Sequence, residues 1–376
     1  MKRSILGIGL MLMGSMAISQ VVKDTSINPQ NLLGTSNKIT FGGYAQIDYN
    51  EKNGSDVGNL DVHRMVMLFG YKLNEKVSFL TEIEYEHVKE VYVEQAYLSY
   101  KANNNFDVLA GLMLVPMGII NEYHEPPTFY GVERPNVDKY IVPTTWRELG
   151  FGISGRIDNA SIKYQAYIFN GFKSFAGGNG ILRGSDGLRK GRQKGAESIV
   201  SSANFSTKID FYGINGLRLG LSGYFGNTQT DDTSIEGSTV GVSMIGMDAR
   251  YKLNQLELRS QFISTSLSGT EKYNALTGKD LGSQMNGFYL ELAYGFDLKG
   301  KEKLSPFIRY EAYNTHADVD GGIELNKEYD RNEMIIGLNY KVAEGAAFKI
   351  DYQFADNALA GTDTTKSFNA GVAVWF

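Results

Sequence analysis

The sequence predicts an all-β protein: a 16-stranded antiparallel transmembrane β-barrel with one long loop folded into its interior. The first reason is that apolar and polar residues alternate with a period of two in segment after segment beyond residue 38, as in strands with two different faces. The second reason is that short and long connections alternate along the chain. This layout is typical of a barrel whose long loops all lie at one end.

The first 19 residues have the pattern of a signal peptide. Lys2 and Arg3 form a basic start, residues 5–13 are apolar, and Ala17-Ile18-Ser19 is a small-residue cleavage site. A buried or membrane-spanning N-terminal helix is the alternative, but the apolar run is shorter than the ~20 residues that a bilayer needs. We therefore expect export through the general secretory route and a short periplasmic N-terminal segment at 20–37, followed by the barrel at 38–376.

Strand patterns follow one another to the C-terminus. Around residue 290, for example, Phe288, Leu290 and Leu292 alternate with Tyr289 and Glu291. About sixteen such strands are expected, at 38–50, 62–72, 76–86, 92–101, 106–114, 146–157, 160–169, 199–210, 216–226, 239–252, 255–266, 284–297, 304–314, 333–341, 346–354 and 367–376.

Lipid explains why each strand has an apolar face. A sheet that spans a membrane must satisfy every backbone N–H and C=O internally, so it closes on itself and exposes an apolar band. A soluble sandwich is the alternative, but it has no reason to gather its long loops at one end. Barrels of this size enclose an aqueous channel. Charged residues of both signs are expected on the channel wall: Arg64, Glu82, Glu84, Glu148, Arg156, Lys163, Arg218, Arg250, Arg259, Glu291 and Arg309.

The connection at 115–145 is predicted to narrow the channel. It holds five of the seven prolines, which restrict its shape and remove hydrogen-bond donors. An ordinary exterior loop is the alternative. If the loop folds inward, the residues that could set ion preference there are Glu122, His124, Glu125, Glu133, Arg134, Asp138 and Lys139, with Arg147 just after the loop.

Residues 93–125 and 132–155 resemble the phosphate-selective porin O and P family of Gram-negative outer membranes. The resemblance lies mainly in Gly111 to Gly118, the Glu133-Arg134-Pro135 triplet and the step from Arg147 to Gly150. The opening at 41–50 and the ending at 372–376 are similar to Bacteroidetes-type porins of the same group.

The resemblance implies a 16-stranded channel of the outer membrane, a homotrimer, and a third long loop that enters the lumen. Phosphate-specific members use arginines and lysines along the route, and Arg134 and Arg147 match the motif positions. This sequence departs from that pattern, because carboxylates are about as frequent as bases on its inward faces. The transported solute, and whether anions such as phosphate are preferred, stay open.

The expected function is passive diffusion of small hydrophilic solutes or ions. The expected partners are outer-membrane lipid, lipopolysaccharide and the barrel-assembly machinery, for which the terminal Phe376 resembles the recognition signal. Loop 170–198 carries extra basic residues that could attract anions, contact lipopolysaccharide or simply be solvated. With a net charge of −5, binding to nucleic acid is disfavoured.

Two other functions remain as alternatives: a surface adhesin or receptor on a barrel, and an outer-membrane hydrolase. The hydrolase is disfavoured because none of the four histidines, at 63, 87, 124 and 316, lies beside an evident serine in the pattern of a catalytic pair. Asp318 and Asp320 lack the spacing of a calcium loop, and the chain has no cysteine. No cofactor, metal or catalytic site is therefore expected.

Overall fold

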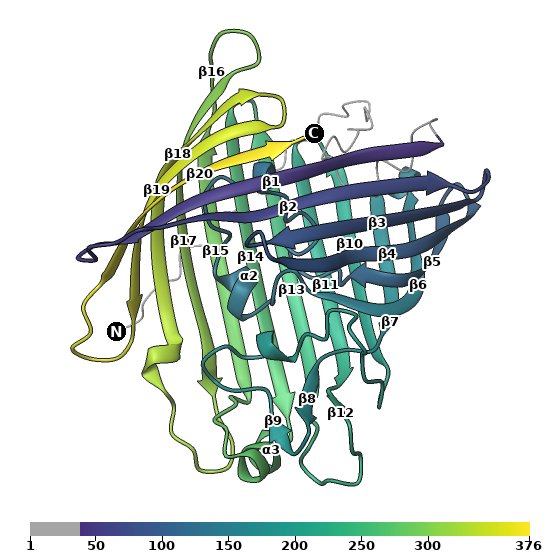
Figure 1. Ribbon diagram of the computed structural model, residues 1–376, viewed down its shortest axis with the longest axis vertical. Coiled ribbons are helices and arrows are strands. Elements are labelled where there is room, and N and C mark those ends of the chain that lie inside the picture. Colours follow the sequence, from purple (N-terminus) through teal and green to yellow (C-terminus); the bar gives the residue numbers. More distant parts are fainter. Residues whose placement is uncertain (1–37) are drawn as a thin grey trace, which may run out of the picture.

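The computed structural model describes residues 38–376 as one closed antiparallel barrel of sixteen strands (Figure 1). The expected signal peptide at 1–19 and the segment at 20–37 lie outside the described residues. The wall strands are β1 (Ile39–Lys52), β2 (Asn59–Lys72), β3 (Val77–Glu86), β4 (Glu90–Asn103), β5 (Phe106–Leu114), β6 (Arg147–Ile157), β7 (Ile162–Phe169), β10 (Asn204–Ile214), β11 (Leu217–Asn227), β13 (Gly241–Leu253), β14 (Leu256–Ser268), β15 (Gln284–Tyr294) with its continuation β16 (Phe296–Asp297), β17 (Lys303–Asp318), β18 (Asp330–Ala343), β19 (Ala346–Asn357) and β20 (Thr365–Trp375).

Each strand pairs with the next along the chain, and β1 pairs with β20 to close the barrel. The ladder of this closing pair runs from Tyr44 opposite Trp375 to Lys52 opposite Ser367. Backbone bonds between Gly43 and Phe376 extend the seam to the last residue. A closed ladder leaves no strand edge exposed, as a bilayer requires.

The predicted alternation of faces is confirmed. Along β15, Phe288, Leu290 and Leu292 are exposed on the outside, whereas Tyr289 and Glu291 are buried inside. The expected strand 199–210 is shifted, since β10 begins only at Asn204. The amide N–H groups of Ser201 and Ser202 bond instead to the side chain of Gln229, so they are not available to a ladder.

The long connections lie at one end of the barrel, which we call the long-loop end (Figure 1). They carry the small sheet of β8 (Lys173–Ala176), β9 (Asn179–Gly180) and β12 (Gln229–Thr230), together with helices η3 (Arg189–Gly191), α3 (Thr270–Thr277) and η4 (Lys327–Tyr329). The opposite, short-turn end has tight connections and one helical turn, η2 (Asp158–Ala160). Within residues 38–376, no helix is long and apolar enough to cross a membrane.

The size of the barrel predicts an interior filled with water. The structure differs, because two loops enter the interior. Residues 115–145, with η1 (Pro126–Thr128) and α2 (Val137–Tyr140), lie across the inside of the barrel (Figure 1). The connection between β7 and β10 follows, and Phe172 in it stacks on Trp146 at 4.3 Å. Tyr167 and Tyr224, from the wall, join this buried cluster. These aromatic side chains therefore pack inside the barrel and not against lipid.

Candidate functional site

Residues 115–145 fold into the barrel and are largely buried there, so the predicted inward loop is confirmed. We call this segment the constriction loop. Wall side chains hold its backbone from several strands. Lys349 on β19 donates hydrogen bonds to the carbonyl oxygens of Pro126, Phe129 and Gly131 at 2.6, 2.8 and 2.9 Å. Asp351, on the same strand, accepts one from the N–H of Val132 at 2.7 Å.

The α2 end of the loop is bound to β14, β17 and β18. Glu311 accepts a hydrogen bond from the N–H of Val137 at 3.0 Å, and Glu333 accepts two from the Asn136 amide at 2.9 Å. Gln261 donates to the Asp138 carboxylate at 2.9 Å. Burial raises the pKa of Asp138 to about 7. Asp138, expected at the constriction, thus points into the wall.

Glu122 and His124 anchor the other half of the loop. Glu122 pairs with Lys208 at 2.7 Å and with Lys163 at 3.6 Å. Burial alone would raise the pKa of Glu122, but the two lysines lower it below its ordinary value. The His124 Nε2 atom lies 3.3 Å from Glu94; burial opposes protonation of the ring, but the carboxylate outweighs it and raises the pKa of His124.

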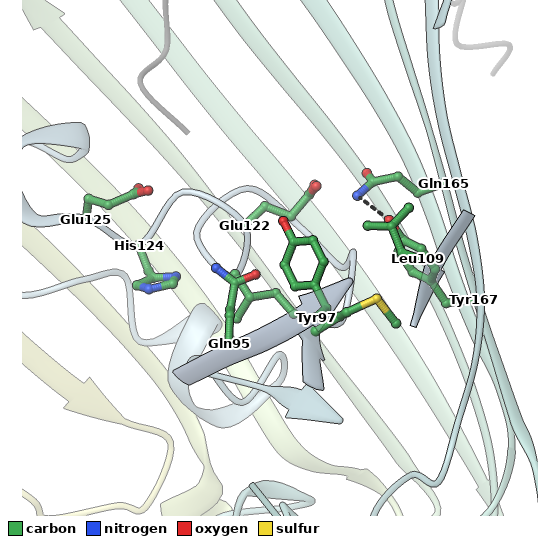
Figure 2. A pocket seen from close by; sticks show the side chains of 10 residues that line it. Gln95, Tyr97, Leu109, Glu122, His124, Glu125, Gln165 and Tyr167 are labelled. Atoms are coloured by element: carbon green, nitrogen blue, oxygen red, sulfur yellow. Dashed lines mark hydrogen bonds between the residues drawn. The ribbon is translucent and has the colours of Figure 1, made fainter. Parts of the chain in front are cut away.

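Figure 2 shows how this half of the loop meets the wall, with Glu122, His124 and Glu125 on one side and Gln95 and Tyr97 nearby. The cavity between them has a volume of about 20 Å³, enough for about one water molecule. Burial raises the pKa of Glu125 to about 7. On this side the loop therefore lies close against the wall.

The remaining loop candidates are more open. Glu133 is half-buried, accepts a hydrogen bond from Asn50 at 3.2 Å and receives Arg309 on its carbonyl oxygen at 3.4 Å. Lys139 is exposed, with Nζ 5.5 Å from the ring of Tyr140. Of the whole predicted set, Glu133, Arg134 and Lys139 keep partial or full exposure.

The wall candidates all face inward but lie in two parts of the lumen. Most have partners inside the barrel wall: Arg64 lies 3.6 Å from Glu84, Arg309 contacts Glu291 and Glu311, and Glu82 accepts a hydrogen bond from Gln95. Glu148 accepts one from the Trp146 indole. The other four, Arg156, Arg218, Arg250 and Arg259, lie in or near the short-turn half of the lumen. Here too there are carboxylate partners: Arg218 and Arg250 lie 2.9 and 4.0 Å from Asp210, and Arg259 lies 3.8 Å from Glu291.

A cavity of about 460 Å³ opens at the short-turn end, between this end of the barrel and the constriction loop. Tyr123 and Tyr130 of the loop form part of the cavity wall. The Arg250 guanidinium lies 4.8 Å from the centre of the Tyr123 ring, and that of Arg259 lies 5.0 Å from the centre of the Tyr130 ring. Basic residues outnumber acidic ones in its lining: Arg250, Lys252, Arg259, Lys303 and Lys341 against Glu257 and Glu344.

A second group of cations lies on the long-loop side of the constriction loop. Arg189 and Arg192, on the inserted β7–β10 connection, donate to the carbonyl oxygen of Thr144. Arg147 and Lys194 both lie over the ring of Tyr92, at 5.6 and 4.3 Å. We call Arg134, Arg147, Arg189, Arg192 and Lys194 the basic cluster.

Three arginines of the basic cluster make no ion pair with the residues that the structure describes. Within residues 38–376, no carboxylate lies in salt-bridge distance of Arg134, Arg147 or Arg192. Buried nitrogen atoms of Arg134 and Arg147 have no hydrogen-bond partner among these residues. Burial, and then the charge of Arg64, lower the pKa of Arg134 to about 10. Burial, and then Arg189, lower that of Arg192 to about 9.

Sequence reasoning found Arg134 and Arg147 but missed Arg189 and Arg192 as interior residues. Their loop has the composition of an exposed tip, and only its apolar positions, such as Leu182 and Leu188, signal that it is buried. Glu94 was also missed. Glu82 pairs with Gln95 and Ile83 with Val93, so Glu94 is the one extra residue of a β-bulge in β4. This bulge breaks the alternation that sequence reasoning relies on.

Comparisons with known proteins agree with the architecture. No family model matches the chain. The outer membrane channel DcaP of Acinetobacter baumannii aligns with a TM-score of 0.61 at 12% identity, covering 90% of this chain and 97% of that one. The anion-selective porin from Comamonas acidovorans aligns with a TM-score of 0.54 at 12% identity, covering 90% of this chain and 99% of that one. The trimer form of OmpT of Vibrio cholerae aligns with the same TM-score of 0.54 at 12% identity, again covering 90% of this chain and 99% of that one.

At these identities the solved structures establish the fold, which is that of outer-membrane porins. A closer relative is known from sequence. An uncharacterized protein of Aquifex aeolicus (strain VF5) is 34% identical in an alignment 338 residues long, which covers 84% of this chain and 75% of that protein. The chain belongs to the same family as this Aquifex aeolicus protein.

Proposed function

We propose that the protein is an outer-membrane channel for passive diffusion of small hydrophilic solutes and ions, with a preference for anions such as phosphate. The observation that carries the anion preference is the basic cluster on the long-loop side of the constriction loop. Its cations lie beside the loop that narrows the channel, and three of its arginines lack a carboxylate partner among residues 38–376. Fixed charge at a narrow point sets ion preference.

An anion entering from the long-loop end would meet conditions that favour its binding. Arginine donates several N–H groups in a planar fork that matches phosphate oxygens. Arg134 and Arg147 each have a buried nitrogen without a hydrogen-bond partner among residues 38–376, so neither guanidinium uses its full donor capacity within the protein. On the far side of the loop, basic residues outnumber acidic ones in the lining of the cavity at the short-turn end, which extends the positive field. Most charges on the wall, Arg250 and Arg259 included, have carboxylate partners and contribute less to this field than the basic cluster does.

The relatives lend the proposal further support. One neighbour in fold is described as an anion-selective porin and another as a trimer. We therefore infer a homotrimer in the outer membrane of a Gram-negative bacterium, in contact with lipid and lipopolysaccharide. A hydrolase has less support, because the His124 ring is engaged by Tyr44 and Glu94 rather than by a serine.

The deciding measurement is the reversal potential of the purified protein in planar bilayers under a KCl gradient. The wild type should be anion-selective, and the R134Q/R192Q double variant should shift toward cations. Lys299→Gln, which removes one charge from an exposed short turn, is the control and should behave as wild type. Added phosphate should reduce the chloride current in the wild type, with at least tenfold weaker inhibition in the double variant. Cation selectivity in the wild type, or no conductance, would overturn the proposal.

A further inference from the structure

Two histidines and one aspartate converge at the long-loop end of β2 and β3. The ligand atoms of Asp61, His63 and His87 all lie within 4.8 Å of one another. The Asp61 Oδ2 atom is 2.5 Å from Nδ1 of His87 and 3.8 Å from Nδ1 of His63. Nothing in the proposed channel function accounts for this group.

A β-bulge brings Asp61 and His63 together. Gln46 pairs with Arg64 and Asp48 with Asp61, so β2 has one residue more than β1 between these partners, and His63 lies within the bulge. Asp48 is buried beside Gln46, whose side chain contacts the constriction loop. Asp61, directly opposite Asp48, therefore lies on the lumen face. Bulges commonly redirect a side chain in this way.

The turn after β3 brings in the third side chain. His87 and Val88 both have left-handed backbones, with φ of +53° and +66°. This conformation is unfavourable for a β-branched residue such as Val88. The His87 N–H donates to the carbonyl oxygen of His63 at 3.2 Å, and the two rings are perpendicular with centroids 5.4 Å apart. The turn thus holds both imidazoles beside one carboxylate.

A second such group, Glu82, Glu94 and His124, makes a useful contrast. It is fully buried between wall and loop, and both ring nitrogens of His124 already have partners in Asn121 and Tyr44. The group at the long-loop end is open to water: the side chains of Asp61, His63 and His87 are 24, 28 and 41% exposed. Within residues 38–376 the His63 ring makes no hydrogen bond.

We propose that Asp61, His63 and His87 bind a divalent transition-metal ion, Zn²⁺ being the best match, at the extracellular mouth of the barrel. Two imidazole nitrogens and one carboxylate oxygen are the ligand set of many three-residue zinc sites, in which water takes the fourth position. Binding would replace the Asp61–His87 hydrogen bond by two metal bonds and join β2 to the β3–β4 turn. The site stands on its own geometry and does not depend on whether the barrel conducts.

The test is calorimetric titration of the untagged, folded full chain in detergent with ZnCl₂. We expect one site per chain in the micromolar range, with at least tenfold weaker binding in His63→Asn and in His87→Asn. His316→Asn is the matched control, because this histidine also lies at the long-loop end but bonds to backbone groups of Asp280 and Asn326. It should retain wild-type affinity.

A second readout is the visible absorption of bound Co²⁺, which is intense in tetrahedral sites and should disappear with either substitution. Folding of each variant is checked by its heat-modifiable migration on gels, and Asp61→Asn replaces any variant that does not fold. Equal Zn²⁺ affinity in the wild type and in His63→Asn/His87→Asn, or an absence of Zn²⁺ binding by the wild type, would overturn the proposal.

Discussion

Lys208 on β10 and Glu122 of the constriction loop form an ion pair of 2.7 Å with almost no access to solvent, their side chains being 0 and 5% exposed. Lys208 also donates to the carbonyl oxygen of Gly118 and lies 3.6 Å from Asp248. The loop is therefore held inside the barrel by charges on the wall, and its prolines only limit the shapes available to it. Loss of either partner leaves a buried charge uncompensated.

Glu122→Ala should destabilise the protein by about 3 kcal/mol, because Lys208 would then lose its nearest carboxylate in a dry site. The measurement is the temperature at which the folded band disappears on a heat-modifiability gel. Glu344→Ala is the control, since its pair with Lys301 has the same 2.7 Å length but is exposed. Exposed pairs contribute little, so the control should unfold at the wild-type temperature. Equal shifts in the two variants would contradict the buried-anchor interpretation.

Lys349→Met should enlarge the channel. Within residues 38–376, Lys349 is the one side chain that donates to the carbonyl oxygens of Pro126, Phe129 and Gly131. Without it, this part of the loop loses most of its contact with β19. We expect a larger single-channel conductance with more open-state noise. Lys341→Met, a nearby wall lysine that lines the cavity at the short-turn end, is the control for loss of charge alone. If both variants conduct alike, Lys349 acts through its charge and not as a loop anchor.

The barrel could be predicted from the sequence because its determinants are local. Alternation along a strand such as β15 follows directly from one face meeting lipid and the other the lumen. Prediction failed where side chains interrupt the ladder. The Gln229 side chain takes the N–H groups that would have started β10 early, and this contact joins residues 27 and 28 positions apart. Sequence periodicity contains no information on such a contact.

The constriction loop was predictable from its prolines, but the roles of its residues were not. Glu122, His124 and Asp138 have the composition of a charged channel lining, yet each one binds the wall. Whether a carboxylate faces water or a buried lysine depends on residues far away in sequence, such as Lys208. Arg192 shows the reverse error. It comes from a loop that looks like an exposed tip and reaches Thr144 inside the barrel.

Stability should fall as pH rises through neutrality, in part because of Glu125. Burial raises the pKa of this carboxyl from 4.5 to about 7. The protonated form of Glu125 is favoured in the folded protein. Its contribution to the free energy of unfolding is therefore fully present below about pH 4.5 and is lost as pH rises through 7. The expected loss is roughly 2 kcal/mol between pH 5 and 8. The unfolding temperature of the wild type should fall across this pH range, and that of Glu125→Gln should fall less. Glu328→Gln, an exposed carboxylate, should leave the profile unchanged; parallel profiles for wild type and Glu125→Gln would rule out this role.

Deletion of Phe376 should impair assembly of the barrel. Its backbone exchanges two hydrogen bonds with Gly43, of 2.9 and 3.0 Å, and these extend the seam between β1 and β20. Its ring lies against Gly43, where an added Cβ would come within 2.9 Å of it, and 6.1 Å from the ring of Phe41. Without this residue the last strand loses the end of its ladder, so we expect at least tenfold less folded protein in the membrane fraction. Phe296→Ala, which removes an equally exposed aromatic ring from another strand at the short-turn end, should assemble normally. Normal insertion of the shortened chain would show that closure of the seam does not depend on its terminal residue.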